Sequence, residues 1–558
     1  MKMSGAELTI RLLERQGITC LAGIPGGANL PLYDALSRSV QIRHVLTRHE
    51  QGAGFIAQGM ARSSGRPAVF FATSGPGATN TLTALADAKM DSIPIVCITG
   101  QVPLPMIGTD AFQEIDIYGM SVPVTKHNYL ARTVEELLRI IPEAFTIATS
   151  GRPGPVLIDI PKDVQTGMLE IAELPGPGEL DAPVAPDPAL VRRAADIINA
   201  AERPMLLLGG GSNHPDTAAL ALSLVAGCGI PAAMSLQGLG VIPQEHPLAL
   251  GMLGMHGARC TNMLLEECDL LIVVGARFDD RATGRMERFC PGATVIHIDT
   301  DAGEVGKLRE VDAGIIADAG LTLKTLLPFL STQGRRAWLD RVAVLKATHG
   351  MAKGDSNPCS AYGIIGHAAS LTDGSTIIVT DVGQHQMRVA QVFPFARPRQ
   401  WLTSGGLGTM GFGLPAAIGA ALQHPEATVL LFTGDGSLLM NIQELATLAE
   451  QQANVKIILC NNNGLGLVRQ QQELFYGGRV FASGYTGVVD FPGIARGFGI
   501  AAINLSGTDR PEKDLAKALG ARGPYLIEVD IRADDKVFPM VPPGAANIDM
   551  MIGEEYDA

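Results

Sequence analysis

Charged residues, cysteines and long apolar runs are all scarce in this sequence of 558 residues. Only 18% of the residues are charged and 46% are hydrophobic, which is typical of a well-packed globular protein. Positive charge is in deficit, since the net charge is −13, so nucleic acid is not expected as the main partner. No apolar run approaches the length that spans a bilayer, and no membrane association is expected. The 8 cysteines form no CxxC pair and lie mostly in or beside apolar runs, which predicts a reducing, cytoplasmic location.

Short apolar runs of buried-strand type alternate with helical patterns along most of the chain. This alternation predicts parallel sheets covered by helices on both faces. The runs span residues 68–72, 93–98, 156–160, 205–208, 270–274, 294–298, 376–380, 428–433 and 455–460. Segments rich in Pro and Gly at 172–190 and 350–361 read as linkers. They predict domains at 1–170, 188–335 and 360–540, followed by a C-terminal tail at 541–558.

Two turns that follow such runs place polar side chains one strand–helix–strand unit apart. In "LLFTGDGSLL", Asp435 stands between two glycines, and Asn462 of "NNNGLG" follows it by 27 positions. Both turns are therefore expected at the carboxyl edge of one parallel sheet. A carboxylate, an amide oxygen and a backbone carbonyl suit Mg²⁺, and the glycines let backbone amides approach a phosphate. A plain strand-to-helix turn, capped by Asp435 or Ser437, is the alternative.

This pairing resembles the cofactor signature of thiamine diphosphate enzymes. The resemblance implies that Asp435, Asn462 and the Gly464 carbonyl hold Mg²⁺, while Glu50 in "RHEQGAGFIAQGMAR" activates the cofactor. For Glu50 alone, an acidic residue in the first turn of a helix is the alternative. "TSGPGATN", "DVGQHQM" and "LGTMGFGLP" resemble cofactor loops of the family, in which Met410 bends the cofactor. The residues expected around thiamine diphosphate are Glu50, Pro76, Asn80, Gly383, Gln384, His385, Gly408, Met410, Gly434, Gly436, Ser437, Gly464, Leu465 and Gly466.

The whole chain resembles the catalytic large subunits of the acetohydroxyacid synthase, or acetolactate synthase, family. The resemblance rests on "GIPGGANLPLYDAL", "IGTDAFQEID", "SGRPGPVLIDIPKDVQ", "GMLGMHG", "VGARFDDR" and "VPPGAAN". These transferases decarboxylate pyruvate and join the two-carbon unit to a second pyruvate or to 2-ketobutyrate, in branched-chain amino acid biosynthesis. The resemblance implies three doubly wound α/β domains in the order pyrimidine-binding, FAD-binding and diphosphate-binding. It also implies a homodimer or homotetramer and a small regulatory subunit.

A third cofactor, FAD, is implied for the middle domain by the same resemblance. "LLLGGGSN" follows a strand with three glycines, but it is not GxGxxG, and by itself it is better explained as a glycine-rich turn. In the family, FAD is structural. The expected contacts are Arg152, Gly209, Gly210, Gly211, Leu253, Gly254, Met255, His256, Gly275, Arg277, Asp279, Arg281, Asp299 and Asp318.

Recognition of a ketoacid carboxylate requires a cation, and "RFDDR" supplies Arg277 and Arg281. Surface salt bridges within this cluster are the alternative. By resemblance, Arg281 meets the second ketoacid, and Met255 and Phe112 shape its side-chain pocket. Gly27 and Gln113 are expected near the reacting carbons, and Lys162 at the channel mouth.

The sequence departs from the family at two informative positions. Gln471 stands where members that strongly prefer 2-ketobutyrate carry Trp, which predicts weaker discrimination and lower sensitivity to herbicidal inhibitors. Arg388 stands where Trp is usual, which adds a charge beside the diphosphate loop or at a subunit contact and predicts altered local packing there. The alternatives are a pyruvate oxidase, a glyoxylate carboligase, the catabolic acetolactate synthase that lacks FAD, and a catalytically inactive flavin-binding homologue.

Overall fold

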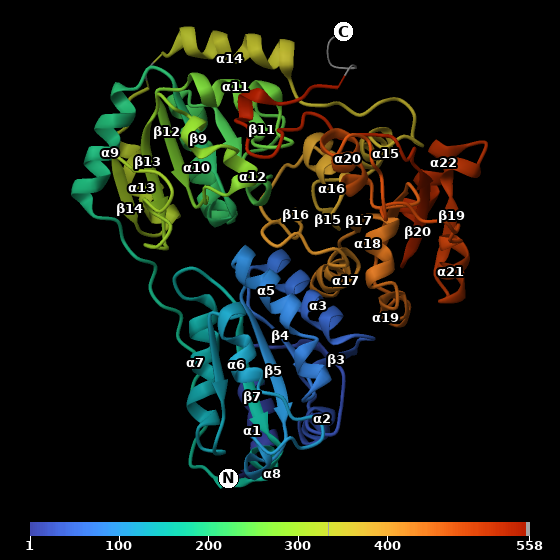
Figure 1. The fold of residues 1–558 in the computed structure, drawn as a ribbon. Coiled ribbons are helices and arrows are strands. Elements are labelled where there is room, and N and C mark those ends of the chain that lie inside the picture. Colours follow the sequence, from blue (N-terminus) through green and yellow to red (C-terminus); the bar gives the residue numbers. More distant parts are fainter. Residues whose placement is uncertain (333, 554–558) are drawn as a thin grey trace.

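The computed structural model describes residues 1–332 and 334–553, so residues 554–558 of the expected tail lie outside it. Three parallel sheets of six strands each, flanked by helices, confirm the prediction of three α/β domains. Figure 1 shows the N-terminal domain at the bottom, the middle domain at the upper left and the C-terminal domain at the upper right. Among the described helices, none is both long and apolar enough to cross a bilayer.

The N-terminal sheet has the strand order β3-β2-β4-β5-β7-β6. Its strands are β2 (Cys20–Gly23), β3 (Arg43–Leu46), β4 (Ala68–Ala72), β5 (Ile95–Gln101), β6 (His127–Leu130) and β7 (Val156–Pro161). A separate antiparallel pair joins β1 (Lys2–Ser4) to β8 (Met168–Glu170). The helices are α1 (Gly5–Arg15), α2 (Leu30–Ser37), α3 (Glu50–Ser64), α4 (Pro76–Thr79), α5 (Leu82–Asp91), α6 (Ile117–Ser121), α7 (Leu137–Thr149) and α8 (Lys162–Thr166).

The C-terminal sheet repeats this topology, with the order β16-β15-β17-β18-β20-β19. Numbered along the chain within each sheet, both orders read 2-1-3-4-6-5. The strands are β15 (Ile377–Thr380), β16 (Trp401–Leu402), β17 (Val429–Gly434), β18 (Val455–Asn461), β19 (Ala501–Asn504) and β20 (Tyr525–Asp530). The helices are α15 (Gly363–Ser370), α16 (Gln384–Val392), α17 (Gly413–Gln423), α18 (Asp435–Met440), α19 (Glu444–Gln451), α20 (Gly466–Phe475), α21 (Phe491–Gly497) and α22 (Pro511–Gly520).

The middle sheet has a different order, β11-β10-β9-β12-β13-β14, which reads 3-2-1-4-5-6 along the chain. This is the order of dinucleotide-binding sheets, whose ligands lie where the strand order reverses, here between β9 and β12. The strands are β9 (Pro204–Leu208), β10 (Ala232–Met234), β11 (Ala249–Met252), β12 (Leu270–Val274), β13 (Thr294–Asp299) and β14 (Ala313–Ile316). The helices are α9 (Pro188–Ala200), α10 (Pro215–Cys228), α11 (Arg259–Glu267), α12 (Asp280–Thr283), α13 (Ala319–Leu326) and α14 (Arg336–His349).

Helices α3 and α17 form the main contact between the two outer domains, and small residues let their backbones approach closely. A Cβ on Gly59 would lie 2.0 Å from the carbonyl oxygen of Ala416, and one on Gly419 would lie 2.0 Å from that of Ile56. As the residue number rises along α3 it falls along α17, so the helices cross antiparallel. The seam continues the buried core that both domains share.

The segment after β20 returns to the middle domain, where Figure 1 draws it in red beside α11. The amide of Val541 donates to the carbonyl of Met255 at 3.0 Å, and Asn547 Nδ2 donates to the carbonyl of Ala282 at 2.8 Å. This segment therefore holds the loops that contain Met255 and Arg281 against the middle sheet.

Candidate active site

Asp435 begins α18 at the end of β17, but its carboxylate does not cap that helix. The N-cap is Gly434, and no side chain caps the helix. Instead, Asp435 Oδ2 accepts a hydrogen bond of 2.7 Å from the amide of Gly464, in the loop after the adjacent strand β18. Burial raises the pKa of Asp435, an effect that the Gly464 amide partly offsets. The simple capping alternative therefore does not describe this turn.

Three oxygen atoms converge beside Asp435. Asn462 Oδ1 faces the carbonyl oxygen of Gly464 at 2.8 Å and Asp435 Oδ1 at 3.2 Å, while its Nδ2 donates to Gln384 Oε1 at 3.3 Å. Without a cation, this amide would gain hydrogen bonds by exchanging its oxygen and nitrogen. An oxygen facing two other oxygens instead suits a hard divalent cation. The donor set therefore fits Mg²⁺, although no group of three or more His, Cys, Asp or Glu in the described chain forms a metal site.

Gly436, next to these oxygens, is closely surrounded by side chains. A Cβ on Gly436 would lie 2.7 Å from Leu465, 3.0 Å from the Tyr485 hydroxyl and 3.4 Å from Met410 Cε. Met410 and Leu465 thus meet beside the α18 turn. Gly408, in the loop before Met410, has a φ of +69°, which favours glycine.

His385 packs against the same turn. Burial lowers its pKa to about 3, so the ring is neutral at physiological pH, and its Nε2 has no hydrogen-bond partner among the described residues. A Cβ on Gly434 would lie 3.1 Å from His385 Nδ1, so the imidazole packs directly on the glycine turn. His385 lies in the first turn of α16, two residues after Gly383. Ser437 Oγ donates a hydrogen bond of 2.9 Å to the carbonyl of Val382, in the loop before that helix. An unpartnered ring nitrogen and a glycine turn fit a phosphate group.

Glu50 lies on the N-terminal domain, at the start of α3. Its Oε2 accepts a hydrogen bond of 3.0 Å from Asn80 Nδ2, and a Cβ on Gly77 would lie 3.3 Å from its Oε1. His49, not Glu50, supplies the side-chain cap of α3. Pro76 starts the short helix α4, which ends next to Asn80. The structure thus brings together the predicted residues Glu50, Pro76 and Asn80.

Within one chain, the structure does not bring Glu50 to Met410 or Asp435. Because α3 and α17 cross antiparallel near Ile56 and Gly419, the starts of the two helices point in opposite directions. At about 1.5 Å per residue, Glu50 and Gly413, the first residues of the two helices, lie roughly 18 Å apart along the helix axes, and Met410 precedes Gly413. The predicted site residues of a single chain therefore form two separate groups, here named the Glu50 half-site and the Asp435 half-site.

Gln113 lies against the Glu50 half-site. A Cβ on Gly75 would lie 2.8 Å from the Gln113 carbonyl oxygen, and Gln113 itself has a φ of +58°, an uncommon conformation for a residue with a side chain. Its neighbour Phe112 is 87% exposed, and Gly27 is also exposed. Lys162 begins α8 after β7 and is half-buried.

In the middle domain, the predicted glycines meet at the switch point between β9 and β12. The amide of Gly211 donates to the carbonyl of Gly275 at 2.9 Å, and a Cβ on Gly209 would lie 2.1 Å from that carbonyl oxygen. Gly209, Gly211 and Gly275 leave no room for a side chain. Their backbone atoms therefore lie at the edge of the sheet where dinucleotide-binding domains hold a phosphate. The middle domain therefore fits FAD at this position.

Several acidic and basic residues predicted to contact FAD already have partners within the protein. Arg152 Nη1 pairs with Glu304 at 2.9 Å and with Asp301 at 3.2 Å. Asp318 caps α13 and Asp279 caps α12 through backbone amides. Asp299 accepts from the amide of Asp301 at 2.8 Å. Arg277 follows in the same loop as Gly275.

Arg281 and Met255 lie together beside the C-terminal segment. The Met255 amide donates to the Arg281 carbonyl at 2.8 Å, and Arg281 Nη1 lies 3.8 Å from Met255 Sδ. Arg281 Nε lies 3.7 Å from Asp280 Oδ2, so the expected salt bridge within the cluster is present, but the Arg281 side chain is 67% exposed. His256 Nδ1 lies 2.9 Å from the Pro539 carbonyl, and burial lowers its pKa to about 4. Leu253 and Gly254 precede these residues, and Gln471 is exposed on α20.

The structure assigns a positioning role to Asp381, which opens the "DVGQHQM" motif but was not among the predicted site residues. Asp381, at the end of β15, accepts from the amides of Gly411 at 2.8 Å and Gly413 at 3.2 Å, and so holds the loop on both sides of Phe412. Burial raises the pKa of Asp381 to about 6. Its place directly after a buried strand, as for Asp435, is the signal that could have revealed it.

Comparison with known proteins matches all three domains. Residues 3–120, 191–326 and 381–529 match models of the N-terminal TPP binding domain, the central domain and the C-terminal TPP binding domain of thiamine pyrophosphate enzymes. The acetolactate synthase isozyme 1 large subunit of Escherichia coli (strain K12) is 56% identical over 555 residues, covering 99% of this chain and 98% of that protein. The isozyme 2 large subunit of the same strain is 44% identical over 554 residues, covering 98% and 99%. The chloroplastic acetolactate synthase of Arabidopsis thaliana is 42% identical over 570 residues, covering 98% and 84%. The chain therefore belongs to the acetolactate synthase large subunits, within the thiamine pyrophosphate enzyme family.

Proposed function

We propose that this chain is an acetohydroxyacid synthase that decarboxylates pyruvate and transfers the two-carbon unit to a second pyruvate or to 2-ketobutyrate. The observation that carries the proposal is that the Asp435 carboxylate, the Asn462 side-chain amide and the Gly464 carbonyl meet at the ends of adjacent strands. It combines with family membership over nearly the full length of the chain.

Mg²⁺ would be held by the Asp435 carboxylate, the Asn462 amide oxygen and the Gly464 carbonyl. The diphosphate would lie against the α18 turn and His385, whose unpartnered Nε2 is available to it. Bound thiamine diphosphate supplies the carbon nucleophile and the electron sink for decarboxylation. Met410 and Leu465 would shape the thiazole side, because they meet next to Gly436.

Glu50 would hold and move a proton at the pyrimidine ring of the cofactor. Asn80 orients its carboxyl group through one oxygen, which leaves the other oxygen beside Gly77 for the ligand. Such a carboxyl within hydrogen-bond reach of a ring nitrogen is a suitable general acid or base.

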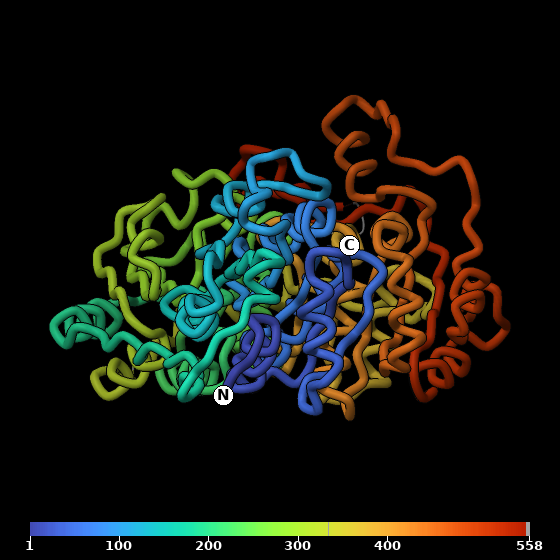
Figure 2. The backbone as a smooth tube through the Cα atoms, turned by 90° about the horizontal axis from the view of Figure 1, so that it is seen from below, coloured from blue at the N-terminus to red at the C-terminus, as the bar shows by residue number. Residues whose placement is uncertain are grey.

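A complete site would form between two copies of the chain, because the Glu50 and Asp435 half-sites are far apart in one copy. Exposed apolar side chains on both half-sites support this arrangement. Phe112 is 87% exposed near Glu50, and Phe481 and Val488, between α20 and α21, are 82% and 93% exposed. Figure 2 shows that the segment between these helices extends away from the rest of the chain. A homodimer or homotetramer would cover these side chains.

FAD would occupy the switch point of the middle sheet, and the second ketoacid carboxylate would meet Arg281. The exposed fork of Arg281 next to Met255 suits a carboxylate that carries a short alkyl chain. The relatives are named large subunits, which supports a small regulatory subunit as a further partner.

Anaerobic incubation of the purified chain with pyruvate, thiamine diphosphate, Mg²⁺ and FAD tests this function. We expect CO₂ and acetolactate, with the flavin remaining oxidised. Acetate together with reduced flavin would instead identify an oxidase.

A further inference from the structure

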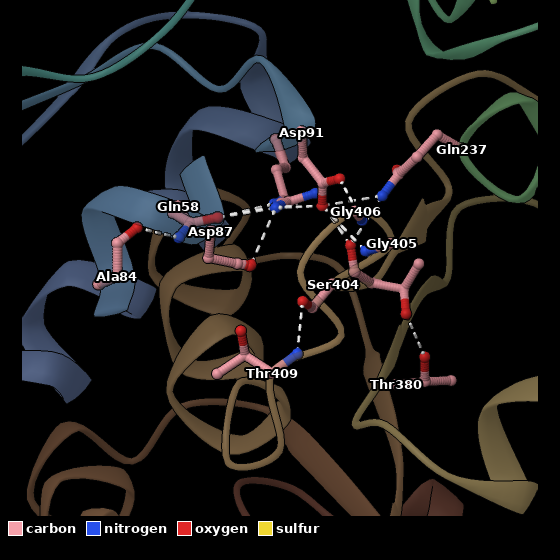
Figure 3. A network of polar contacts seen from close by, with 12 residues as sticks. Gln58, Ala84, Asp87, Asp91, Gln237, Thr380, Ser404, Gly405, Gly406 and Thr409 are labelled. Carbon is pink, nitrogen blue, oxygen red and sulfur yellow. Dashed lines mark hydrogen bonds and ion pairs between the residues drawn. The ribbon is translucent and has the colours of Figure 1, made fainter. Parts of the chain in front are cut away.

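A buried polar network joins all three domains at the end of α5 (Figure 3). The Asp91 side chain is only 1% exposed, and its Oδ2 accepts from Arg62 Nη2 at 2.9 Å. The same oxygen accepts from the amide of Gly405 at 2.9 Å, while Oδ1 accepts from that of Gly406 at 2.7 Å. One carboxylate of the N-terminal domain thus fixes a loop of the C-terminal domain.

Gln237 brings the middle domain into this network. Its Nε2 donates to Asp91 Oδ2 at 3.0 Å and to the Thr403 carbonyl at 3.1 Å, which uses both amide hydrogens. A Cβ on Gly405 would lie 2.4 Å from this nitrogen, so the contact requires glycine there.

On its other side, Gln237 packs against the glycine turn at the FAD switch point. A Cβ on Gly210 would lie 3.2 Å from Gln237 Cβ. The Gln237 carbonyl also accepts from Asn213 Nδ2, in the same turn, at 3.1 Å. A change in how firmly residues 209–213 are held would therefore alter the contacts of Gln237.

The loop that Gln237 and Asp91 hold leads to Met410. Its start is fixed at Gly405 and Gly406, the amide of Thr409 donates to Ser404 Oγ at 2.8 Å, and Asp381 fixes Gly411. Met410 is therefore held between two anchored points, and the first anchor depends on Gln237 and Asp91.

We propose that Gln237 and Asp91 couple the two cofactor sites, so that FAD bound at the 209–211 turn orders the Met410 loop and thiamine diphosphate binds more tightly. The inference rests on the proposed cofactor sites. It makes Gln237 a positioning residue, because it acts through the loop. Linkage then requires thiamine diphosphate to raise the affinity for FAD by the same factor.

Binding titrations of the cofactor-free protein test the coupling without any measurement of activity. The dissociation constant of thiamine diphosphate is measured in the presence of Mg²⁺, with and without saturating FAD. In the unsubstituted chain, FAD should lower this constant at least about fivefold, the lower end of typical coupling. In Gln237→Met, which keeps the side-chain length but loses both donors, the factor should fall close to one. Gln237→Asn, which keeps the amide but is too short to reach Asp91, should give the same loss.

Arg43→Ala is the matched control, since Arg43 contacts Gln451 between the same outer domains without touching the Met410 loop. It should retain the coupling. Two results would overturn the proposed link alone. One is equal coupling in the Gln237 variants and in the unsubstituted chain. The other is independent binding of the two cofactors in the unsubstituted chain. Failure of either cofactor to bind would overturn the cofactor assignment, and this inference with it.

Discussion

Asn80 Nδ2 donates a hydrogen bond of 3.0 Å to Glu50 Oε2. This contact gives Glu50 a fixed orientation that its position at the start of a helix would not require. A proton-transfer group must be held within hydrogen-bond reach of its target, and this contact fixes one oxygen of the Glu50 carboxyl group.

Substitution Glu50→Gln should lower the rate of acetolactate formation by about 10²–10⁴-fold, because the side chain keeps its shape but can no longer exchange a proton. Binding of thiamine diphosphate, measured by titration, should change far less. Glu50→Asp keeps the carboxyl group but shortens its reach. Its rate of acetolactate formation should lie between the rates of Glu50→Gln and the unsubstituted enzyme. A Glu50→Gln enzyme close to the original rate would exclude this role.

Substitution Asp435→Asn should weaken binding of Mg²⁺ by about tenfold or more, because it removes the only carboxylate of the proposed metal site. The concentration of Mg²⁺ that gives half-maximal binding of thiamine diphosphate measures the effect. Asp490→Asn is the control, since Asp490 caps α21 in the same domain. Equal Mg²⁺ requirements in the two variants would contradict the metal assignment.

Substitution Gln471→Trp should raise the preference for 2-ketobutyrate over pyruvate by about 5- to 150-fold, because a flat apolar wall favours one extra methylene by about 1–3 kcal/mol. Competition between the two ketoacids, with both products quantified, provides the ratio. Gln471→Ala, which removes the amide without adding a wall, should leave the ratio low. An unchanged ratio in Gln471→Trp would place Gln471 outside the pocket.

Substitution Arg388→Met should raise the melting temperature of the cofactor-free protein. Arg388 is 2% exposed, no carboxylate of the described residues lies within ion-pair distance, and its Nε has no partner. The Tyr362 ring centroid lies 5.5 Å from its guanidinium carbon. Removing this desolvated charge should stabilise the fold by about 1 kcal/mol or more.

Arg335→Met provides the opposite control for that measurement. Arg335 is also buried, but it donates to the carbonyls of Ile198, Ala201 and Cys228, so its loss should destabilise the protein. A lower melting temperature in both variants would mean that Arg388 has compensation comparable to that of Arg335.

Substitution Asp159→Asn should remove part of the pH dependence of stability. Burial raises the pKa of Asp159 to about 7, and hydrogen bonds from Thr99 and Gln101 only partly offset it. Because the unfolded pKa is about 3.9, the folded state binds the extra proton between about pH 4 and 7. Asp159 therefore contributes stability that is fully present below about pH 4 and lost as the pH rises through 7.

Melting temperatures from pH 4 to 8 measure this effect. As the pH rises, the melting temperature of Asp159→Asn should increase relative to that of the unsubstituted protein. A difference that is independent of pH would mean that Asp159 titrates in the folded protein as it does in the unfolded one.

The strands predicted from the sequence are the central ones of each sheet. The runs at 68–72, 93–98 and 156–160 correspond to the adjacent strands β4, β5 and β7, and those in the other domains correspond to β9, β12 and β13 and to β15, β17 and β18. Such strands are buried on both faces and therefore apolar throughout. Edge strands such as β16, with two residues, carry no comparable signal.

The pairing of Asp435 with Asn462 was predictable because both follow central strands that are neighbours in the sheet. The network of Asp91, Gln237 and Gly405 was not predictable, since it joins residues from three domains that have no common spacing in the sequence. Contacts of this kind depend on how domains pack, and local patterns do not encode that arrangement.

The most direct test of the account is product analysis with ¹³C-labelled pyruvate and unlabelled 2-ketobutyrate, using the purified chain with thiamine diphosphate, Mg²⁺ and FAD. We predict labelled acetolactate together with acetohydroxybutyrate that carries label only in its two-carbon unit, with 2-ketobutyrate moderately favoured. Release of labelled acetate, or no consumption of pyruvate even after a regulatory subunit is added, would contradict the proposed function.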